Sequence, residues 1–262
     1  MFQTRTMQLS LSFIAPSILP ALRDRLVAVF GPIRAERRLD PVSQMVKSLI
    51  SARTYDETAW AAFVRLQAAF PDWNAMATAQ PSEIEKIIDP VTFADRKARQ
   101  LPVLIRVLQL RRRNLDLSLL ADMPINDAMT WLQGLPGIGC KVSAAVLNFS
   151  TLNRRALVVD SHVHRVARRL GLVGRSTLPS EAFAMLMGEA PKDWTAEDLF
   201  EFHWLLKKLG QSVCTDAQPS CALCPMREDC ARVGVSSGGA THIVFRARPA
   251  ADDDLEIDDS HI

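Results

Sequence analysis

The chain has 262 residues, 48% of them apolar and 23% charged, a composition typical of a globular protein with one or two compact domains. No apolar run approaches the ~20 residues that a membrane-spanning helix needs, and residues 1–20 lack the pattern of a secretory signal. The net charge of +2 hides an acidic stretch, because residues 249–262 hold six of the 29 acidic residues and no Lys or Arg. The remaining 248 residues carry +8, which suits a protein that binds a polyanion.

The predicted elements are helices throughout, since apolar residues recur at helical spacing and no segment alternates long enough for a strand. We expect helices over residues 17–30, 41–50, 56–70, 82–88, 95–111, 126–133, 140–149, 161–170, 180–189 and 195–209. Four cap residues mark several of the starts: Asp40, Asp56, Ser82 with its partner Glu85, and Thr195 with its partner Asp198.

Further signals concern helix ends, basic faces and the C-terminal segment. Pro102 should kink the fifth helix or mark its true start, and Gly210 should end the last one. Arg111, Arg112 and Arg113 place cations at the end of the fifth helix, and Arg165, Arg168 and Arg169 form a basic face on a later one. Residues 234–240 are rich in Gly and Ser and predict a flexible linker before a disordered acidic tail.

The segment that organises the chain is a glycine-containing turn between the helices at 126–133 and 140–149. It consists of Leu135, Pro136, Gly137, Ile138 and Gly139. The glycines permit a tight hairpin, and its free N–H groups, with those of the next helix N-terminus, predict an anion site. Lys141 lies in the first turn of that helix, where the macrodipole disfavours a cation and so favours a neutral, nucleophilic amine.

Four of the five cysteines lie in one short segment with the spacing C-x6-C-x2-C-x5-C: Cys214, Cys221, Cys224 and Cys230. Clustered cysteines in a chain without a secretory signal favour a metal site over disulfides. Tetrahedral zinc and a four-cysteine iron–sulfur cluster both require four thiolates, so the spacing leaves both possibilities open.

Three ordered motifs together resemble endonuclease III, of the helix-hairpin-helix superfamily of DNA base-excision glycosylases. They are Leu-Pro-Gly-Ile-Gly-x-Lys at 135–141, Val-Asp-Ser-His at 159–162, and the four-cysteine segment. The resemblance spans roughly residues 20–232. It implies an all-α, two-lobed fold with DNA in the cleft between the lobes, and a [4Fe-4S] cluster on the four cysteines.

The implied domains are an N-terminal extension and helix at 1–33 that joins the cluster lobe, and a six-helix bundle at 34–153 that contains the helix-hairpin-helix. The iron–sulfur cluster lobe follows at 154–233, with the linker and tail at 234–262. The resemblance also implies a monomer that binds double-stranded DNA with damaged bases or abasic sites, not a membrane, in the bacterial cytoplasm and associated with the nucleoid.

The expected activity is that of a bifunctional DNA glycosylase and abasic-site lyase on oxidised pyrimidines. Asp160 would stabilise the positive charge that develops on the sugar, and Lys141, at the position of the family's lyase lysine, would attack C1′. As helix N-cap, Asp160 also has a purely structural interpretation. Arg53 stands where relatives usually have a glutamine that fills the hole left by the flipped base, and Phe93 falls near the position of the family's wedge residue.

Two other functions are compatible with these motifs. A mismatch-adenine glycosylase has the same fold, but that relative lacks a lysine at the position of Lys141. A DNA-binding or redox-sensing protein that keeps the cluster without turnover is the non-enzymatic alternative.

Overall fold

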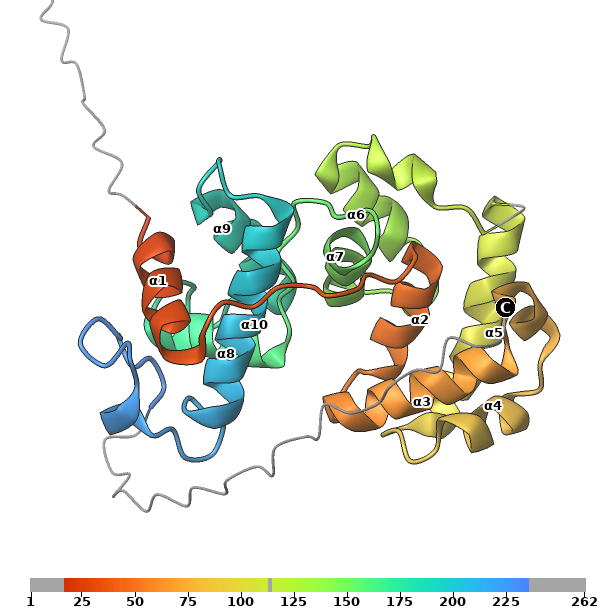
Figure 1. Ribbon diagram of the computed structural model, residues 1–262, viewed down its shortest axis with the longest axis horizontal. Coiled ribbons are helices and arrows are strands. Elements are labelled where there is room, and N and C mark those ends of the chain that lie inside the picture. The colour runs from red at the N-terminus through yellow and green to blue at the C-terminus, as the bar shows by residue number, and fades with distance from the viewer. Residues whose placement is uncertain (1–16, 113–114, 236–262) are drawn as a thin grey trace, which may run out of the picture.

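The computed structural model describes residues 17–112 and 115–235, and all the regular elements in these ranges are helical (Figure 1). The α-helices are α1 (Leu19–Phe30), α2 (Pro41–Ile50), α3 (Asp56–Ala69), α4 (Pro81–Ile88), α5 (Ala94–Arg111), α6 (Ile125–Gln133), α7 (Cys140–Phe149), α8 (Ser161–Leu170), α9 (Pro179–Glu189) and α10 (Ala196–Ser212). Three short 3₁₀ helices are η1 (Trp73–Thr78), η2 (Ser118–Ala121) and η3 (Cys221–Leu223). The expected all-α class is confirmed, since the β-pairing within the described ranges is limited to one isolated bridge, between Leu39 and Ser150.

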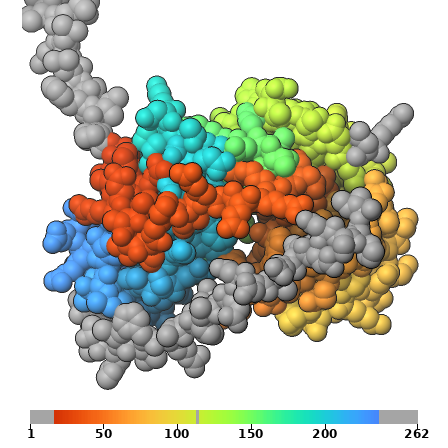
Figure 2. All heavy atoms as spheres, in the orientation of Figure 1, coloured from red at the N-terminus to blue at the C-terminus, as the bar shows by residue number. Residues whose placement is uncertain are grey.

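The helices pack in two groups. Helices α2 to α7 contact one another, with α2 against α7 and α4 against α5, and we call them the bundle. Helix α10 packs against α8 and α1, and α8 contacts α9; we call these four helices the flanking group. Residues 31–40 carry the chain from α1 across to α2, over the face shown in Figures 1 and 2.

Helix α7 joins the two groups, because it contacts α2 and α6 in the bundle and α9 and α10 in the flanking group. One continuous cluster of buried apolar side chains runs through both groups, with Phe63 and Phe202 among the largest fully buried side chains. The first residues of α7 therefore lie where elements of both groups converge. Among the helices of the described ranges, none is long and apolar enough to cross a membrane.

Most predicted helix starts agree with the structure, but two predicted caps are wrong. Asp40 caps α2, its carboxylate accepting the N–H groups of Val42 and Ser43 at 3.0 Å. Asp56 is instead the first residue of α3, whose N-cap is Tyr55. Helix α4 begins at Pro81 after Gln80, so the Ser82–Glu85 capping box does not form.

Two predicted interruptions are also absent. Pro102 lies inside a continuous α5, and α10 runs through Gly210 to Ser212. At Gly210 a Cβ would lie 3.0 Å from the Cβ of His162 and 3.3 Å from Cγ2 of Val166, so this glycine permits close packing of α10 on α8. Residues 1–16, Arg113, most of the predicted linker and the acidic tail lie outside the described residues.

Candidate active site and cysteine cavity

The loop between α6 and α7 is a tight hairpin that requires glycine at one position. Gly137 has a φ of +77°, and a Cβ there would lie 1.4 Å from Nε2 of Gln100 in α5. Gly139 has extended backbone as the N-cap of α7, and a Cβ there would meet nothing within 4 Å. At Gly137 the chain thus lies close against α5. At Gly139, where the space is open, it leads into the first turn of α7.

This hairpin presents unpaired backbone donors. The N–H of Ile138 donates to Leu135, but those of Gly137, Gly139 and Lys141 have no hydrogen-bond acceptor in the part of the chain that the structure describes. No side chain caps α7 either. Free N–H groups at a hairpin and an adjoining helix N-terminus favour an anion such as a phosphate.

Lys141 is partly buried in the first turn of α7, and its desolvation lowers the pKa of its amine below the usual range. The charges around it act in both directions. Asp160 and Asp56 raise this pKa, whereas Lys207 and Lys47 lower it. The net lowering makes the neutral, nucleophilic form of the Lys141 amine more available near neutral pH.

Asp160 is the N-cap of α8, and its Oδ1 accepts the N–H of Val163 at 2.8 Å. Burial alone would raise the pKa of this carboxyl, but the opposing effects of His203, the Val163 N–H, Lys207 and Lys141 hold it below its ordinary value. Asp160 is therefore ionised at neutral pH. The charges of Lys141 and Asp160 interact, so the structure brings these two predicted residues into one site.

Four further ionisable side chains belong to this site and were missed in the sequence: Lys47 of α2, Asp56 of α3, and His203 and Lys207 of α10. The Nζ of Lys207 lies 2.7 Å from Oδ1 of Asp56, which joins the flanking group to the bundle. The Nδ1 of His203 lies 2.8 Å from the carbonyl oxygen of Val158.

One sequence signal could have revealed the pair on α10. His203 and Lys207 are spaced four apart and fall on the same helical face as the apolar residues Leu199 and Leu206. Polar side chains within a buried stripe of this kind need partners from another element. Those partners come from α3 and from the segment before α8, so the sequence does not identify them.

Arg53 and Phe93, the predicted DNA-contacting side chains, are both exposed and lie on neighbouring loops of the bundle. Both have left-handed backbone, with φ of +56° and +58°, and the guanidinium carbon of Arg53 lies 6.0 Å from the centre of the Phe93 ring. The nearby Lys97 fixes the first loop by donating to the carbonyl oxygens of Ile50 and Ala52, each at 2.7 Å. The structure thus places Arg53 and Phe93 together.

The four clustered cysteines line one cavity with Arg169 and are free of disulfides. Burial raises the pKa of the Cys224 and Cys230 thiols, and the charges of other cysteines of the cluster raise both further. Thiols that influence one another in this way lie close together.

A single ion and a multi-atom centre place different demands on these thiols. Zinc binds four thiolates at about 2.3 Å from one point, which brings the sulfur atoms close together. Within the described ranges, no three His, Cys, Asp or Glu side chains converge on such a point. An iron–sulfur cluster binds each thiolate through a different iron atom and so accepts sulfur atoms that surround a larger volume.

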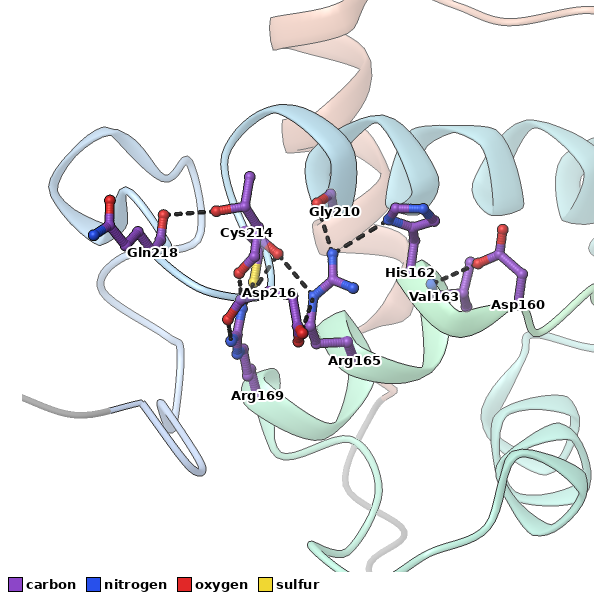
Figure 3. Close-up of polar contacts among 10 residues, drawn as sticks. Asp160, His162, Val163, Arg165, Arg169, Gly210, Cys214, Asp216 and Gln218 are labelled. Atoms are coloured by element: carbon purple, nitrogen blue, oxygen red, sulfur yellow. Dashed lines mark hydrogen bonds and ion pairs between the residues drawn. The ribbon is translucent and has the colours of Figure 1, made fainter. Parts of the chain in front are cut away.

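Helix α8 links the candidate active site to the cysteine cavity (Figure 3). The Nη2 of Arg165 lies 3.2 Å from Nδ1 of His162, and its Nε donates to the carbonyl oxygen of Cys214 at 3.1 Å. Arg169 donates to the same carbonyl oxygen at 3.2 Å and to Sγ of Cys214 at 3.4 Å. Arg165 and Arg169, expected on a basic outer face, are therefore turned toward the cysteine loop.

Comparison with protein families matches residues 46–192 to HhH-GPD, described as the HhH-GPD superfamily base excision DNA repair protein. The chain is 31% identical over 194 residues to endonuclease III homolog 1, chloroplastic, of Arabidopsis thaliana, a match that covers 71% of this chain and 48% of the relative. It is 27% identical over 198 residues to endonuclease III of Thermotoga maritima, a match that covers 75% of this chain and 85% of the relative. The chain thus spans about half the length of the Arabidopsis relative and most of the Thermotoga one.

Solved structures show the same fold. A trapped endonuclease III–DNA covalent intermediate superposes with a TM-score of 0.69 at 22% identity, covering 82% of this chain and 94% of the other. A thermostable thymine-DNA glycosylase superposes with a TM-score of 0.62 at 19% identity, and the match covers 82% of this chain and 96% of the glycosylase chain. At these identities the likeness establishes the fold alone.

Proposed function

The chain belongs to the HhH-GPD superfamily of base excision DNA repair proteins, and from this premise we propose that it is a bifunctional DNA glycosylase and abasic-site lyase. The observation that carries the proposal is the meeting of a desolvated amine, Lys141, with an ionised carboxylate, Asp160, beside unpaired hairpin N–H groups. The proposed substrates are oxidised pyrimidines in double-stranded DNA. We also propose that the protein acts as a monomer.

The proposed reaction begins when the damaged nucleotide leaves the base stack and enters the cleft. As the glycosidic bond breaks, positive charge develops on the sugar, and the Asp160 carboxylate stabilises it. The neutral amine of Lys141 forms a bond to C1′ as the base departs, and loss of a proton with ring opening gives a Schiff base. Removal of a C2′ proton then expels the 3′ phosphate by β-elimination.

The surrounding groups hold the DNA in this proposal. The N–H groups of Gly137 and Gly139 bind a backbone phosphate without using a side chain. Arg53 and Phe93 contact the duplex where the nucleotide leaves the stack, Arg53 in the vacated space and Phe93 as a wedge. The bundle and the flanking group serve as the two lobes on either side of the DNA.

We further propose that Cys214, Cys221, Cys224 and Cys230 hold a [4Fe-4S] cluster. The supporting observation is that all four thiols line one cavity while lacking the convergence that a single ion requires. A bound cluster supplies a rigid crosslink for this otherwise loop-rich segment. Arg169, which lines the same cavity and donates to the Cys214 sulfur, would lie beside a bound cluster.

Borohydride trapping on duplex DNA with one abasic site tests the lyase assignment. We expect the parental protein to form a covalent adduct and nick the strand, and Lys141→Ala to do neither. Lys86→Ala, an exposed lysine of α4, is the matched control and should behave like the parent. If Lys141→Ala nicks abasic DNA at the parental rate, the nucleophile has been assigned wrongly.

Colour and metal content test the cluster. Anaerobically purified protein should be brown, with iron and acid-labile sulfide in equal amounts. A colourless protein that carries one zinc per chain would contradict the proposal. A panel of duplexes, each with a single different lesion, then defines the substrate; base excision without a trapped adduct would favour a monofunctional glycosylase.

A further inference from the structure

Two loops of the bundle carry Arg53 and Phe93, and both residues have left-handed backbone, with φ of +56° and +58°. We propose that Lys97 and Thr54 are positioning residues for DNA: they lock the two loops together, so that both exposed side chains enter the base stack as one rigid unit. The inference rests on the roles that the proposed function gives Arg53 and Phe93. It assigns Lys97 and Thr54 no contact with the DNA.

Lys97 is a buried cation in the first turn of α5, with only 5% of its surface exposed. Its ammonium donates to the carbonyl oxygens of Ile50 and Ala52, each at 2.7 Å, and to Oγ1 of Thr54 at 3.3 Å. An ammonium has three N–H donors, so these three acceptors satisfy it completely. Ile50 ends α2, where helix carbonyls have no partner within the helix. The lysine therefore holds the chain where α2 leads into the loop of Arg53.

Thr54 joins the second loop to the first. Its Oγ1 accepts the N–H of Thr92 at 3.2 Å, and the same hydroxyl donates to the carbonyl oxygen of Ala52 at 3.4 Å. Together with the Lys97 bond, these contacts use the one donor and both lone pairs of the hydroxyl. Thr92 immediately precedes Phe93, so one hydroxyl fixes the backbone next to both exposed side chains.

Lys97 is also bonded to the second loop through its own backbone. Phe93 is the N-cap of α5, and its carbonyl oxygen accepts the N–H of Lys97 at 3.1 Å. The guanidinium carbon of Arg53 lies 6.0 Å from the centre of the Phe93 ring, within the range of a cation–π contact. Lys97 therefore holds the loops of both members of this pair.

The left-handed backbone of both residues explains why such an anchor matters. This conformation is unfavourable for a residue with a Cβ, and it persists only where the surroundings hold it. Opening a base stack is itself unfavourable, and ordering a loose side chain at the same moment adds to that barrier. Loss of Lys97 or Thr54 should therefore slow the opening of paired DNA and leave the chemistry that follows it unchanged.

The experiment compares two duplexes in single-turnover borohydride trapping. Each has one abasic site; one duplex is otherwise fully paired, and the other has mismatched pairs on both sides of the site, so that its stack is already open. We expect Lys97→Met to slow trapping about 10-fold on the paired duplex and less than about 2-fold on the open one. Lys86→Met, at an exposed lysine of α4, is the matched control and should change neither rate.

Thr54 offers a milder test, because Lys97→Met leaves two carbonyls without their donor and can destabilise the fold. Thr54→Val removes the hydroxyl at nearly constant size and should slow trapping about 3-fold on the paired duplex alone. Thr54→Ser keeps the hydroxyl and should trap at the parental rate. In a background with Arg53→Ala and Phe93→Ala, Thr54→Val should have no further effect, because no side chain remains to be positioned.

The outcomes separate this inference from the lyase proposal. Equal slowing on both duplexes, or an effect of Thr54→Val that persists in the alanine background, would overturn the inference and leave the lyase proposal intact. An alanine background that traps both duplexes at the parental rate would do the same, because Arg53 and Phe93 would then have no role in opening the stack. No adduct from the parental protein on either duplex would overturn both proposals.

Discussion

Gly137 and Gly139 are separated by one residue but differ in what a methyl group would meet. At Gly137 the methyl group would overlap Gln100, and the left-handed φ of +77° adds strain for any L side chain. At Gly139 the space is open and φ lies in the ordinary range. A hairpin that binds phosphate through its backbone should therefore tolerate alanine at only one of the two positions.

We expect Gly137→Ala to weaken binding to a duplex with an abasic-site analogue by about 10-fold or more, because the displaced N–H groups no longer fit a phosphate. Gly139→Ala should change the Kd by less than about 3-fold. Fluorescence anisotropy titrations measure both. Equal losses would mean that the hairpin backbone does not set the affinity.

His203 connects the candidate site to pH-dependent stability. It is fully buried, and burial, with smaller effects from Lys207 and Lys141, lowers its pKa to about 4 against the opposing effects of Asp160 and the Val158 carbonyl. A histidine in an unfolded chain has a pKa near 6.5. Between these values the unfolded chain binds a proton that the folded protein does not, so the free energy of unfolding decreases as the pH falls from about 6.5 to about 4.

His203→Asn should remove this contribution, which is at most about 3 kcal/mol at pH 4. The asparagine amide can still donate to the Val158 carbonyl, so stability at pH 7.5 should change less than stability at pH 4.5. Melting temperatures across this range give the measurement. A variant whose melting temperature falls with pH as steeply as the parent's would show that other groups dominate acid unfolding.

At the scale of the elements, apolar spacing and cap residues located the helices, and errors arose where a tertiary partner changed a residue's role. Asp56 has the chemistry of an N-cap, but its carboxylate pairs with Lys207 of α10. Gly210 is a residue type that often ends helices, but here it lies within α10 and permits close packing against α8. Neither partner is visible from the local sequence, because each lies on a helix distant in the chain.

Gly210 leads to a test of that packing. Gly210→Ala should lower stability by about 1–3 kcal/mol, because the added methyl group forces α10 away from His162 and Val166. Gly188→Ala in α9 is the matched control, since its methyl group would meet nothing within 4 Å and a helical alanine gains about 0.5–1 kcal/mol over glycine. Chemical denaturation gives both values, and a Gly210→Ala variant more stable than the parent would contradict the packing argument.

At the scale of the whole molecule, the candidate site is assembled from α2, α3, α7, α10 and the start of α8. Motifs pointed to Lys141 and Asp160, because each sits at a helix start with a recognisable sequence. Lys47, His203 and Lys207 lie within ordinary amphipathic helices, and only the packing of the two groups brings them together. The two proposed reacting groups could therefore be named from the sequence, but their electrostatic surroundings could not.

Removal of the proposed cluster should make the cysteine loop more mobile and leave the bundle unchanged. The cysteine loop is tied to α8 through Arg169 and to α1 through the ion pair between Arg25 and Asp229. Oxidative loss of the cluster should speed tryptic cleavage after Arg227 and Arg232 by about 10-fold or more, since the loop has few buried apolar contacts of its own. Hydrogen exchange in α3 to α5 should stay at the level of the loaded protein; a general rise would mean that the cluster stabilises the whole fold.

The route of the chain between its two groups has a consequence for synthesis on the ribosome. Among the described helices α1 is translated first, yet the surface it packs against, α10, emerges only after the whole bundle has been translated. The helices of the bundle are consecutive in the sequence, so the bundle is free to fold as it leaves the exit tunnel. Until α10 has been translated, the apolar face of α1 stays exposed. Nascent-chain arrest before α10 should therefore yield a protease-resistant bundle from which α1 can be cleaved.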